Sequence, residues 1–272
     1  MINMLHITAR PRSAALRPFI ASFHYNESDL AQAVERILPN GQAHLMINLD
    51  EDEFRTYGGA GCGALQRSRG AVLAGPHGRA TAIDTREQRR LVAVEFRPGG
   101  AAAFLQMPLS EACDQIVDID EFWGGQGRVL RERLLDARAP SRMFGLLESV
   151  LLDRFAVSPD RAMLAAARML ERGLTLADTR TRLGLLPKTF VRRFREHTGL
   201  TPKRYARVRR LQAVVGSVCR RGEVDWSGIA ADFGYADQAH LIHDFRDLTG
   251  LTPTAYRPSS RQRRNHVPLS VA

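Results

Sequence analysis

Two short segments near the C-terminus carry side chains that suit hydrogen bonding to the edges of nucleic-acid bases. The first contains Lys188 and Arg192, which stand four residues apart and therefore share one face of a helix. The second contains Gln238 and His243. An arginine fork fits the O6 and N7 atoms of guanine, and a glutamine amide fits N6 and N7 of adenine. These residue types predict recognition by hydrogen bonds rather than covalent chemistry.

The two segments belong to a repeat. FREHTGLTPKRYAR begins at Phe194 and FRDLTGLTPTAYRP begins at Phe245, an offset of 51 residues. Eight of the first 13 aligned residues are identical. Two copies are too few for a solenoid, so the repeat predicts a pair of similar small modules.

Each copy follows a pattern that predicts two short helices around a turn. Thr175 and Asp225 can cap the first helices, because a side-chain oxygen satisfies backbone N–H groups that a helix start leaves unpaired. Gly184 and Gly234 supply the turns. Apolar residues four apart give each second helix a buried face, formed by Phe190, Phe194, Leu241 and Phe245. A buried stripe beneath a polar outer face predicts a helix-turn-helix.

A tandem pair of such units, each closed by TGLTPxxY, resembles the AraC/XylS family of bacterial transcription regulators. The resemblance covers about residues 158–258, and its most specific stretch is GIAADFGYADQAHLIHDFRDLTGLTPTAYR. It implies an all-α DNA-binding domain. The implied parts are a helix-turn-helix at about 175–197, a long linker helix at about 202–220 and a second helix-turn-helix at about 225–248. The two reading helices of such a domain lie in successive major grooves, roughly 34 Å apart.

The resemblance also implies which residues contact double-stranded DNA. The positions expected to read bases are Lys188, Val191, Arg192, Gln238, Ala239, Ile242 and His243. The positions expected to contact phosphates are Arg195, Lys203, Arg204, Arg207 and Arg246. Val191 and Ile242 are apolar, which fits either contact with thymine methyl groups or packing in the core.

The first unit departs from the family pattern at three positions. Thr179 and Arg180 stand where the second unit has Ile229 and Ala230. Leu186 stands where the family often has a small hydroxyl residue that caps the reading helix. A long charged side chain at a close helix crossing must turn outward or spread the two helices. These substitutions leave open whether the first unit reads bases.

Charge divides the chain into two parts. Residues 158–272 hold 21 Lys and Arg against 10 Asp and Glu, a net charge of +11. Residues 1–157 hold 18 against 19, a net charge of −1. This asymmetry is expected when one part meets phosphates and the other does not. The basic tail 259–272 is predicted to be disordered and to add nonspecific phosphate contacts.

The sequence of residues 1–157 predicts a domain that senses a signal, oligomerises, or does both. Strand patterns occur at 43–49, 70–75, 81–85 and 90–98, and helical patterns follow at 101–107, 127–137 and 142–155. This order resembles the sensory domains of AraC-type regulators. The fold class is therefore predicted as α+β, a cupin-like small β-barrel with helices, followed by the all-α domain described above. The apolar stripe of 142–155 fits either a dimer interface or packing on its own barrel.

No motif for catalysis or metal binding stands out in this domain. His6, His24, His44 and His77 are scattered singly, whereas metal-binding cupins place convergent ligands in an HxH arrangement. The chain has no P-loop, GxSxG or GxGxxG motif. We therefore expect no metal, no cofactor and no enzyme activity. Arg97 in FRPGG is the candidate anchor for an anionic effector, and a local carboxylate is its alternative partner.

The sequence thus predicts a cytoplasmic regulator. It has no apolar run near 18 residues that could span a membrane, and its three cysteines are far apart, which fits a reducing compartment. The expected partners are double-stranded DNA, a small-molecule effector, a second copy in a homodimer and, for an activator, RNA polymerase. Three alternatives remain open. They are a regulator whose N-terminal domain only oligomerises, an enzyme fused to a DNA-binding domain, and a nonspecific DNA-compacting protein.

Overall fold

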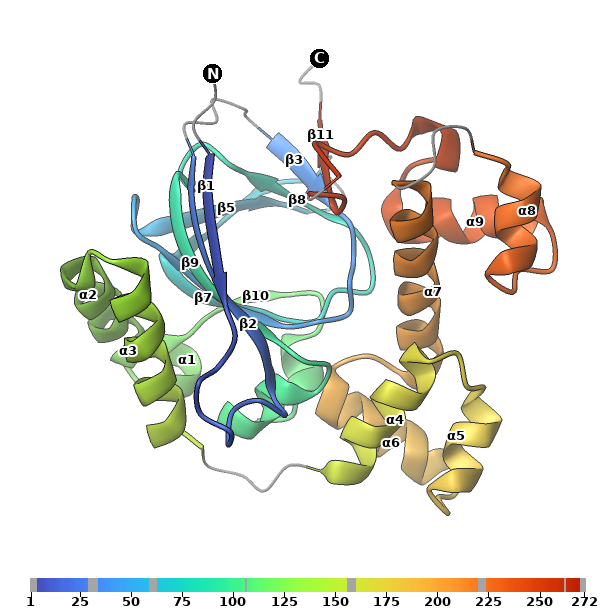
Figure 1. The fold of residues 1–272 in the computed structure, drawn as a ribbon, viewed down its shortest axis with the longest axis horizontal. Coiled ribbons are helices and arrows are strands. Elements are labelled where there is room, and N and C mark those ends of the chain that lie inside the picture. Colours follow the sequence, from blue (N-terminus) through green and yellow to red (C-terminus); the bar gives the residue numbers. More distant parts are fainter. Residues whose placement is uncertain are drawn as a thin grey trace.

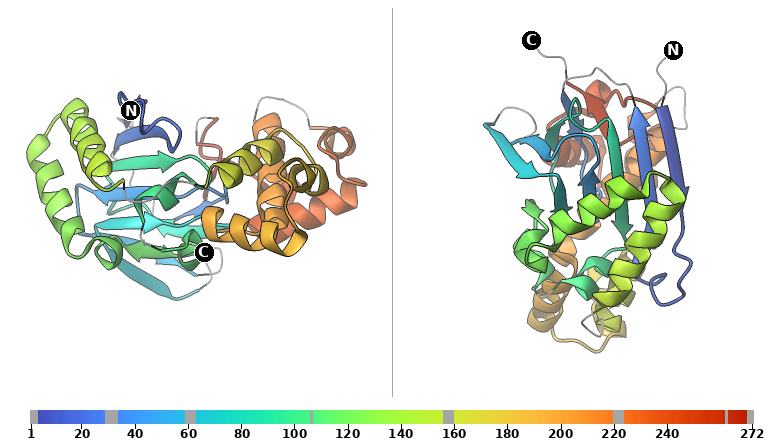
Figure 2. Two further views of the ribbon diagram at one scale, coloured as in Figure 1. Left: turned by 90° about the horizontal axis from the view of Figure 1, so that it is seen from below. Right: turned by 90° about the vertical axis from the view of Figure 1, so that its left-hand side faces the viewer.

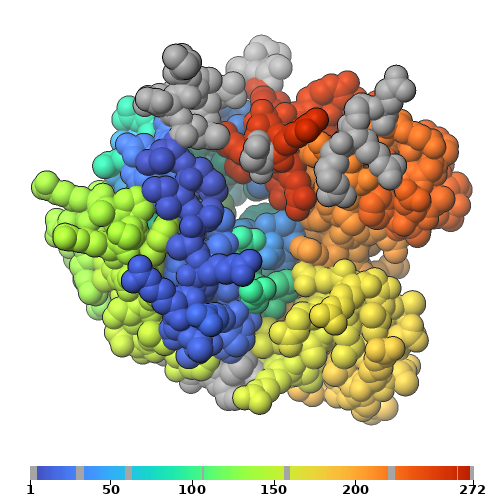
Figure 3. Space-filling model, in the orientation of Figure 1, coloured from blue at the N-terminus to red at the C-terminus, as the bar shows by residue number. Residues whose placement is uncertain are grey.

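The structure is a computed structural model, and it describes residues 4–28, 34–58, 63–105, 107–155, 160–219, 224–261 and 263–269. The described strands form two antiparallel sheets, and the C-terminal half is helical and lies beside them (Figure 1). The space-filling view shows that half as two lobes, one yellow and one orange to red, against the blue and teal strands (Figure 3). The predicted fold class is confirmed, although the two sheets form a barrel-like arrangement that does not close.

One sheet has six strands and the other has five. The six-stranded sheet runs in the order β1 (Met4–Ala9), β2 (Ile20–Ser28), β9 (Arg90–Phe96), β4 (His44–Asn48), β7 (Ala71–Ala74) and β10 (Ile116–Asp118). The five-stranded sheet runs in the order β11 (His266–Pro268), β3 (Val34–Ile37), β8 (Thr81–Asp84), β5 (Glu53–Tyr57) and β6 (Leu65–Arg69). β1 ends the larger sheet, so one of its edges pairs with no described strand.

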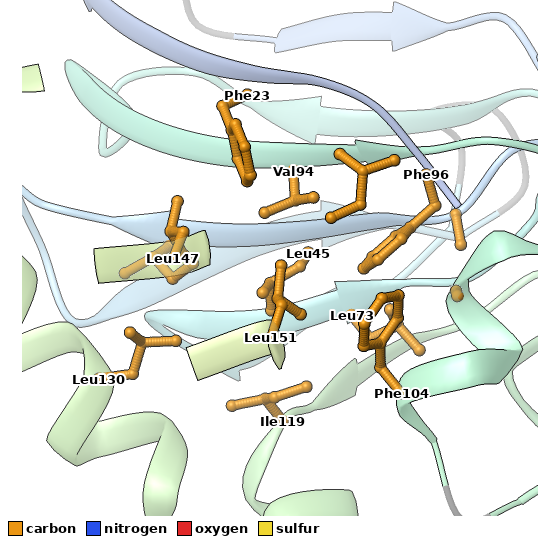
Figure 4. Packing of buried hydrophobic residues seen from close by; sticks show 14 of the residues in the cluster. Phe23, Leu45, Leu73, Val94, Phe96, Phe104, Ile119, Leu130, Leu147 and Leu151 are labelled. Carbon is orange, nitrogen blue, oxygen red and sulfur yellow. The ribbon is translucent and has the colours of Figure 1, made fainter. Parts of the chain in front are cut away.

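The main hydrophobic core lies between the six-stranded sheet and three helices on its outer face (Figure 2). These helices are α1 (Asp120–Trp123), α2 (Gln126–Ala137) and α3 (Pro140–Asp153). Phe23 of β2 stacks on Phe144 of α3, with 5.8 Å between ring centroids. Leu147 and Leu151 of α3 are fully buried in the same core (Figure 4). The apolar stripe of α3 therefore packs on its own domain.

The sequence predicts four of the strands, at the positions of β4, β7, β8 and β9. Over its described residues, the segment 101–107 is not the predicted α-helix. It contains most of the 3-10 turn η2 (Gly100–Phe104), and a second 3-10 turn, η3 (Leu109–Ala112), follows it. The flanking residues account for the difference. Gly99 is in the left-handed conformation directly before η2, and Pro108 disfavours helical geometry at the residue before it.

The C-terminal half contains two small cores that share one long helix. Its helices are α4 (Arg161–Glu171), α5 (Leu176–Arg182), α6 (Pro187–Thr198), α7 (Pro202–Val218), α8 (Trp226–Asp232), α9 (Gln238–Thr249) and the 3-10 turn η4 (Pro253–Ala255). Tyr205, near the start of α7, is buried in the core around α6. Val208, Leu211 and Val215, further along α7, are buried in the core around α9. α7 therefore fixes the two modules relative to each other.

The C-terminal tail differs from the expected disordered segment over the residues that the structure describes. Strand β11 pairs antiparallel with β3 of the N-terminal half. Glu35 of β3 is 1% exposed, accepts a hydrogen bond from Arg263 Nη2 at 2.7 Å and lies 2.8 Å from His266 Nδ1. Burial opposes ionisation of Glu35, but the hydrogen bond with His266 and the charges of His266 and Arg263 outweigh it and lower its pKa. The tail is placed by a buried carboxylate that lies more than 200 residues away in sequence.

Candidate nucleic-acid interface

Helices α5 and α6 form the first helix-turn-helix. The start of α5 is capped as predicted, since Thr175 Oγ1 accepts a hydrogen bond from the backbone N–H of Asp178 at 3.0 Å. Gly184 makes the turn with φ 64°, a left-handed conformation that favours glycine. α6 then buries Phe190 and Phe194, which are 3% and 0% exposed. The opposite face of α6 lies at the molecular surface.

Helices α8 and α9 form the second helix-turn-helix. Asp225 caps α8 and Asp237 caps α9, each through a carboxylate oxygen that accepts from a backbone N–H, at 3.0 and 2.7 Å. Gly234 makes the turn with φ 69°. Leu241 and Phe245 are buried beneath α9 at 0% and 2% exposure. The second unit thus has a side-chain cap at the start of both helices.

The repeated TGLTP motif closes both units in the same way. Thr198 and Thr249 each donate a hydrogen bond to the main-chain oxygen four residues earlier, at 2.8 and 2.7 Å. Gly199 and Gly250 end the helices in the left-handed conformation, with φ 83° and 70°. The tyrosine that ends each motif meets the phenylalanine of the buried stripe edge-on, at 5.5 Å in the first unit and 5.9 Å in the second. Sequence identity in the repeat therefore reflects one local structure made twice.

The residues expected to read bases all lie on the exposed faces of α6 and α9. They are Lys188, Val191 and Arg192 on α6, and Gln238, Ala239, Ile242 and His243 on α9. Val191 is 45% exposed and Ile242 is 37% exposed, and they occupy the same position of the repeat. Neither side chain packs in a core. Whether these residues read bases stays a prediction.

Two of these residues have partners on their own surface. Arg192 Nη1 donates to both carboxylate oxygens of Glu196, one helical turn along, at 3.1 and 3.0 Å. Ser227 Oγ of α8 donates to Gln238 Oε1 at 2.9 Å. An amide oxygen accepts two hydrogen bonds, so Gln238 retains one acceptor site and both N–H donors for a base edge. Ser227 is a positioning residue that the sequence analysis did not single out.

The three unusual residues of the first unit each have a structural consequence. Leu186 precedes α6, is 73% exposed and provides no side-chain cap. Thr179 is 0% exposed, and its Oγ1 has no hydrogen-bond partner among the described residues. Arg180 is only partly buried, whereas its counterpart Ala230 is 1% exposed. The first unit therefore contains a buried unpaired hydroxyl and an uncapped reading helix.

The residues expected to contact phosphates fall into two groups. Arg195, Lys203 and Arg246 are exposed, and none of their side chains forms an ion pair within the described part of the chain. Arg204 Nη1, by contrast, lies 2.6 Å from Asp114 Oδ2 of the N-terminal half. It is half-buried and joins the two halves of the molecule.

Arg207 also has carboxylate partners. Its Nη2 lies 2.5 Å from Asp244 Oδ1 and 2.7 Å from Asp247 Oδ2, both on α9. The hydrogen bond from Arg207 lowers the pKa of Asp247. The basic run on α7 thus contributes to internal structure at two positions where charge alone predicts phosphate contacts.

A groove of about 680 Å³ runs along the exposed face of α6. Its lining residues are Ser110, Pro187, Lys188, Val191, Arg192, Arg195, Glu196 and Thr201. Ser110 belongs to η3 of the N-terminal half, which packs against α6. The reading face of the first unit therefore borders the N-terminal half, which no feature of the sequence indicated.

Arg97, the candidate effector anchor, lies at the surface. Its Nε donates to the main-chain oxygen of Arg17 at 2.9 Å, and it lines neither the groove along α6 nor the cavity between β1 and α3. The expected alternative, a carboxylate partner, is not observed among the described residues either. An effector role for Arg97 stays a prediction, and the structure adds no support for it.

A polar cluster that the sequence analysis missed lies on the inner face of the six-stranded sheet. Ser22 Oγ donates to Glu95 Oε2 at 2.9 Å, and His24 Nε2 lies 3.2 Å from the same oxygen. The hydrogen bond from His24 lowers the pKa of Glu95 to about 2, although burial opposes this. Burial lowers the pKa of the nearby His44 to about 4. The period-2 alternation of β2 was the signal that could have placed His24 on this face.

Two further findings concern the described residues only. No helix in them is long and apolar enough to cross a membrane. They contain no group of three or more His, Cys, Asp or Glu side chains that could hold a metal ion.

Comparisons with known proteins agree with this two-part organisation. A family model described as a helix-turn-helix domain matches residues 179–259. A second model, described as a domain of unknown function (DUF6597), matches residues 8–118. No curated protein sequence matches the chain.

Solved structures of ToxT from Vibrio cholerae are similar in arrangement. An apo form of a ToxT variant is 12% identical, with a TM-score of 0.46 over 86% of this chain and 96% of that chain. A second ToxT structure is 10% identical, with a TM-score of 0.44 over 94% of this chain and 97% of that chain. A ToxT structure bound to an unsaturated fatty acid is 11% identical, with a TM-score of 0.42 over 94% of each chain.

The family assignment follows from the matched segments and the geometry of the two reading helices. Residues 179–259 cover most of α5 and all of α6 to α9, which contain both turns and both exposed helix faces. The chain carries an AraC-type helix-turn-helix domain at its C-terminus, behind a DUF6597 domain, and is a DNA-binding transcription regulator.

Proposed function

We propose that this regulator binds specific DNA by placing α6 and α9 in two successive major-groove segments. The N-terminal domain, in this proposal, controls that binding by taking up an effector, by pairing with a second copy of the chain, or by both. An activator of this kind would also contact RNA polymerase. The proposal assigns base reading to the exposed faces of α6 and α9. It assigns no residue a catalytic role.

The observation that carries the proposal is the matched pair Val191 and Ile242. Each is an exposed β-branched residue, 45% and 37% exposed, at the same position of a repeat whose outer face is otherwise polar. Apolar side chains on such a face gain free energy when a partner covers them. Methyl groups of thymine line the major groove and supply that partner, whereas phosphates do not. A surface that binds only phosphates gains nothing from two apolar residues at equivalent positions of the repeat.

The basic residues of α6, α7 and α9 need separate roles. We assign phosphate contacts to Arg195, Lys203 and Arg246, because their side chains are exposed and form no internal ion pair in the described chain. Arg204 and Arg207 are already paired with carboxylates, and phosphate contacts would require them to leave those partners. Their assigned role is to hold α7 against the N-terminal half and against α9.

The contacts between the two halves support control by the N-terminal domain. The backbone N–H of Ala80 donates to the main-chain oxygen of Leu248 in α9 at 2.8 Å. Arg79 Nη2 lies 3.0 Å from Asp247 of the same helix. Together with the Arg204–Asp114 ion pair, these contacts tie α9 and α7 to the N-terminal domain, and η3 of that domain packs against α6. A shift of that domain would therefore change the distance or angle between α6 and α9.

A binding selection on genome fragments tests the proposal. Purified full-length protein is incubated with sheared genomic DNA at about physiological salt, and the bound DNA is sequenced. The expected result is a motif with two half-sites about one helical turn, ~10 base pairs, apart. A single short half-site would show that one unit contributes little. Retention of all sequences alike, with only a steep salt dependence, would contradict sequence-specific reading.

A further inference from the structure

A slot between the edge of the six-stranded sheet and α3 has the form of a ligand site. Its volume is about 330 Å³, which falls at the lower end of the range for small-molecule pockets, about 300–1,000 Å³. Ile7 and Ala9 of β1 and Phe23 of β2 line one wall, and Phe144 and Gly145 of α3 line the other. These walls are apolar, so the slot suits an apolar ligand body.

Gly145 leaves the slot accessible on the side of α3. A glycine within a helix lowers helix stability relative to alanine. Gly145 does not adopt a positive φ, and a Cβ built on it would meet no described atom within 4 Å. By contrast, a Cβ on Gly127 of α2 would meet Ile119 Cγ2 at 2.0 Å, so close packing explains that glycine. Gly145 is exposed, so no packing requires its small size, and it leaves the mouth of the slot open.

The rim of the slot carries positive charge. Arg10 and Arg12 line it, both are exposed, and neither guanidinium has an ion-pair partner among the described residues. Glu148 also lines the slot, but its Oε1 already accepts a hydrogen bond from the backbone N–H of Ser13 at 2.7 Å. The first turn of α3, at Ser141, completes the rim and adds the positive end of a helix dipole. Two arginines against one carboxylate leave the rim with a net positive charge.

We propose that the slot binds a small organic carboxylate, with an apolar body between the sheet and α3 and the carboxylate at Arg10 and Arg12. A guanidinium holds a carboxylate through charge-assisted hydrogen bonds, which fixes the orientation of the ligand. The inference rests on the proposed function in one respect, namely that this ligand is the effector. Figure 1 shows α3 on the side of the sheets away from α6 and α9, so the ligand acts on DNA binding without touching DNA.

Three probes that share one apolar body test the site. They are 4-phenylbutyrate, 4-phenylbutan-1-ol and 4-phenylbutylamine, titrated into the full-length protein by calorimetry without DNA. The carboxylate is expected to bind at least about tenfold more tightly than the alcohol and the amine, because only it gains the charge-assisted hydrogen bonds. Equal affinity for the three probes overturns the proposal, as does preference for the amine.

Substitutions at Gly145 test whether the ligand occupies the slot. Gly145→Leu is expected to weaken carboxylate binding by more than tenfold, because the leucine side chain fills the volume next to Phe144. Gly145→Ala, the matched control, leaves most of the volume open and should change the affinity less than about threefold. Thermal unfolding of both variants checks that each is folded. Full affinity in a folded Gly145→Leu variant places the ligand elsewhere and overturns the proposal.

The arginines are tested by charge removal. The double variant Arg10→Gln, Arg12→Gln should lose about tenfold in affinity for 4-phenylbutyrate and none for the alcohol. Arg133→Gln removes the same charge from the exposed face of α2, outside the slot lining, and should leave both affinities unchanged. An equal loss for Arg133→Gln would show a general charge effect and overturn the assignment. Since binding is measured without DNA, the slot and the DNA-reading function can fail separately.

Discussion

The two helix-turn-helix units have nearly the same closing motif, but their second helices start differently. In both, the threonine, glycine and tyrosine of TGLTPxxY make equivalent contacts, at distances that agree within a few tenths of an ångström. Before the reading helix they differ, because Asp237 caps α9 while the exposed Leu186 leaves α6 uncapped. The packing that holds a reading helix is thus retained in both copies, and the features that fix its start are present only in the second.

This difference indicates unequal roles in DNA binding. A capped helix has a defined first turn, and the residues expected to read bases in α9 begin at Gln238, directly after the cap. α6 instead starts at Pro187 without a side-chain cap and borders η3 of the N-terminal half. We infer that the second unit carries most of the sequence specificity, and that the first is the unit whose binding depends more on the N-terminal domain.

The largest expected effect concerns the buried core that the two units have in common. Phe194→Ala and Phe245→Ala remove equivalent side chains that are 0% and 2% exposed. Each substitution should lower the free energy of unfolding by about 3–5 kcal/mol, because both leave a cavity in a small core. Urea unfolding of the two variants measures this. If the two losses of unfolding free energy differ by more than about 1 kcal/mol, the two cores are not equivalent.

The next prediction tests whether the second unit contributes more to base recognition than the first. Gln238→Ala should weaken binding to the selected operator by about 1–3 kcal/mol and leave binding to random DNA almost unchanged, because a base contact is lost. Lys188→Ala is the comparison variant in α6, where Pro187 stands at the position of Gln238, and it should cost less on the operator. Fluorescence anisotropy on both DNAs at one salt concentration gives the four affinities. If Lys188→Ala costs as much as Gln238→Ala, the second unit does not dominate.

Much of the C-terminal half could be predicted from the sequence because its determinants are local. Caps at Thr175 and Asp225, glycine turns and a four-residue apolar spacing depend on neighbours along the chain, and each is present in the structure. Exposure of Val191 and Ile242 could not be predicted, since an apolar residue on a helix fits a core equally well. The structure decides that point by showing both at the surface.

The N-terminal half was harder to predict because its determinants are long-range. Strands such as β2 carry polar residues on an inner face that only the second sheet explains, and the tail strand β11 depends on Glu35 across the molecule. The roles of Arg204 and Arg207 were also set by distant carboxylates, namely Asp114 and those on α9. Charge counting cannot distinguish a cation that awaits a phosphate from one that already has a carboxylate.

A smaller effect concerns the buried hydroxyl of the first unit. Thr179→Val should raise the free energy of unfolding by about 1 kcal/mol, because it removes a hydroxyl that is buried without a hydrogen-bond partner and keeps the side-chain shape. Thr198→Val is the matched control with the opposite sign, since Thr198 Oγ1 donates to Phe194 O at 2.8 Å. It should lower stability by about 1 kcal/mol. Destabilisation by Thr179→Val would mean that the hydroxyl has a partner in solution.

The smallest effect tests the cap difference directly. Leu186→Asp gives α6 the cap that α9 has, and should stabilise the protein by about 0.5–1 kcal/mol, while Asp237→Ala should destabilise it by a similar amount. The same pair tests the link to function. If the missing cap limits base reading by the first unit, Leu186→Asp should lengthen the selected operator motif in the half-site of that unit. Asp237→Ala should weaken the sequence preference in the half-site of the second unit. If both variants change stability as expected but the operator motif is unaltered, helix capping does not determine sequence specificity. Any difference in base reading between the two units would then come from the contact of α6 with η3.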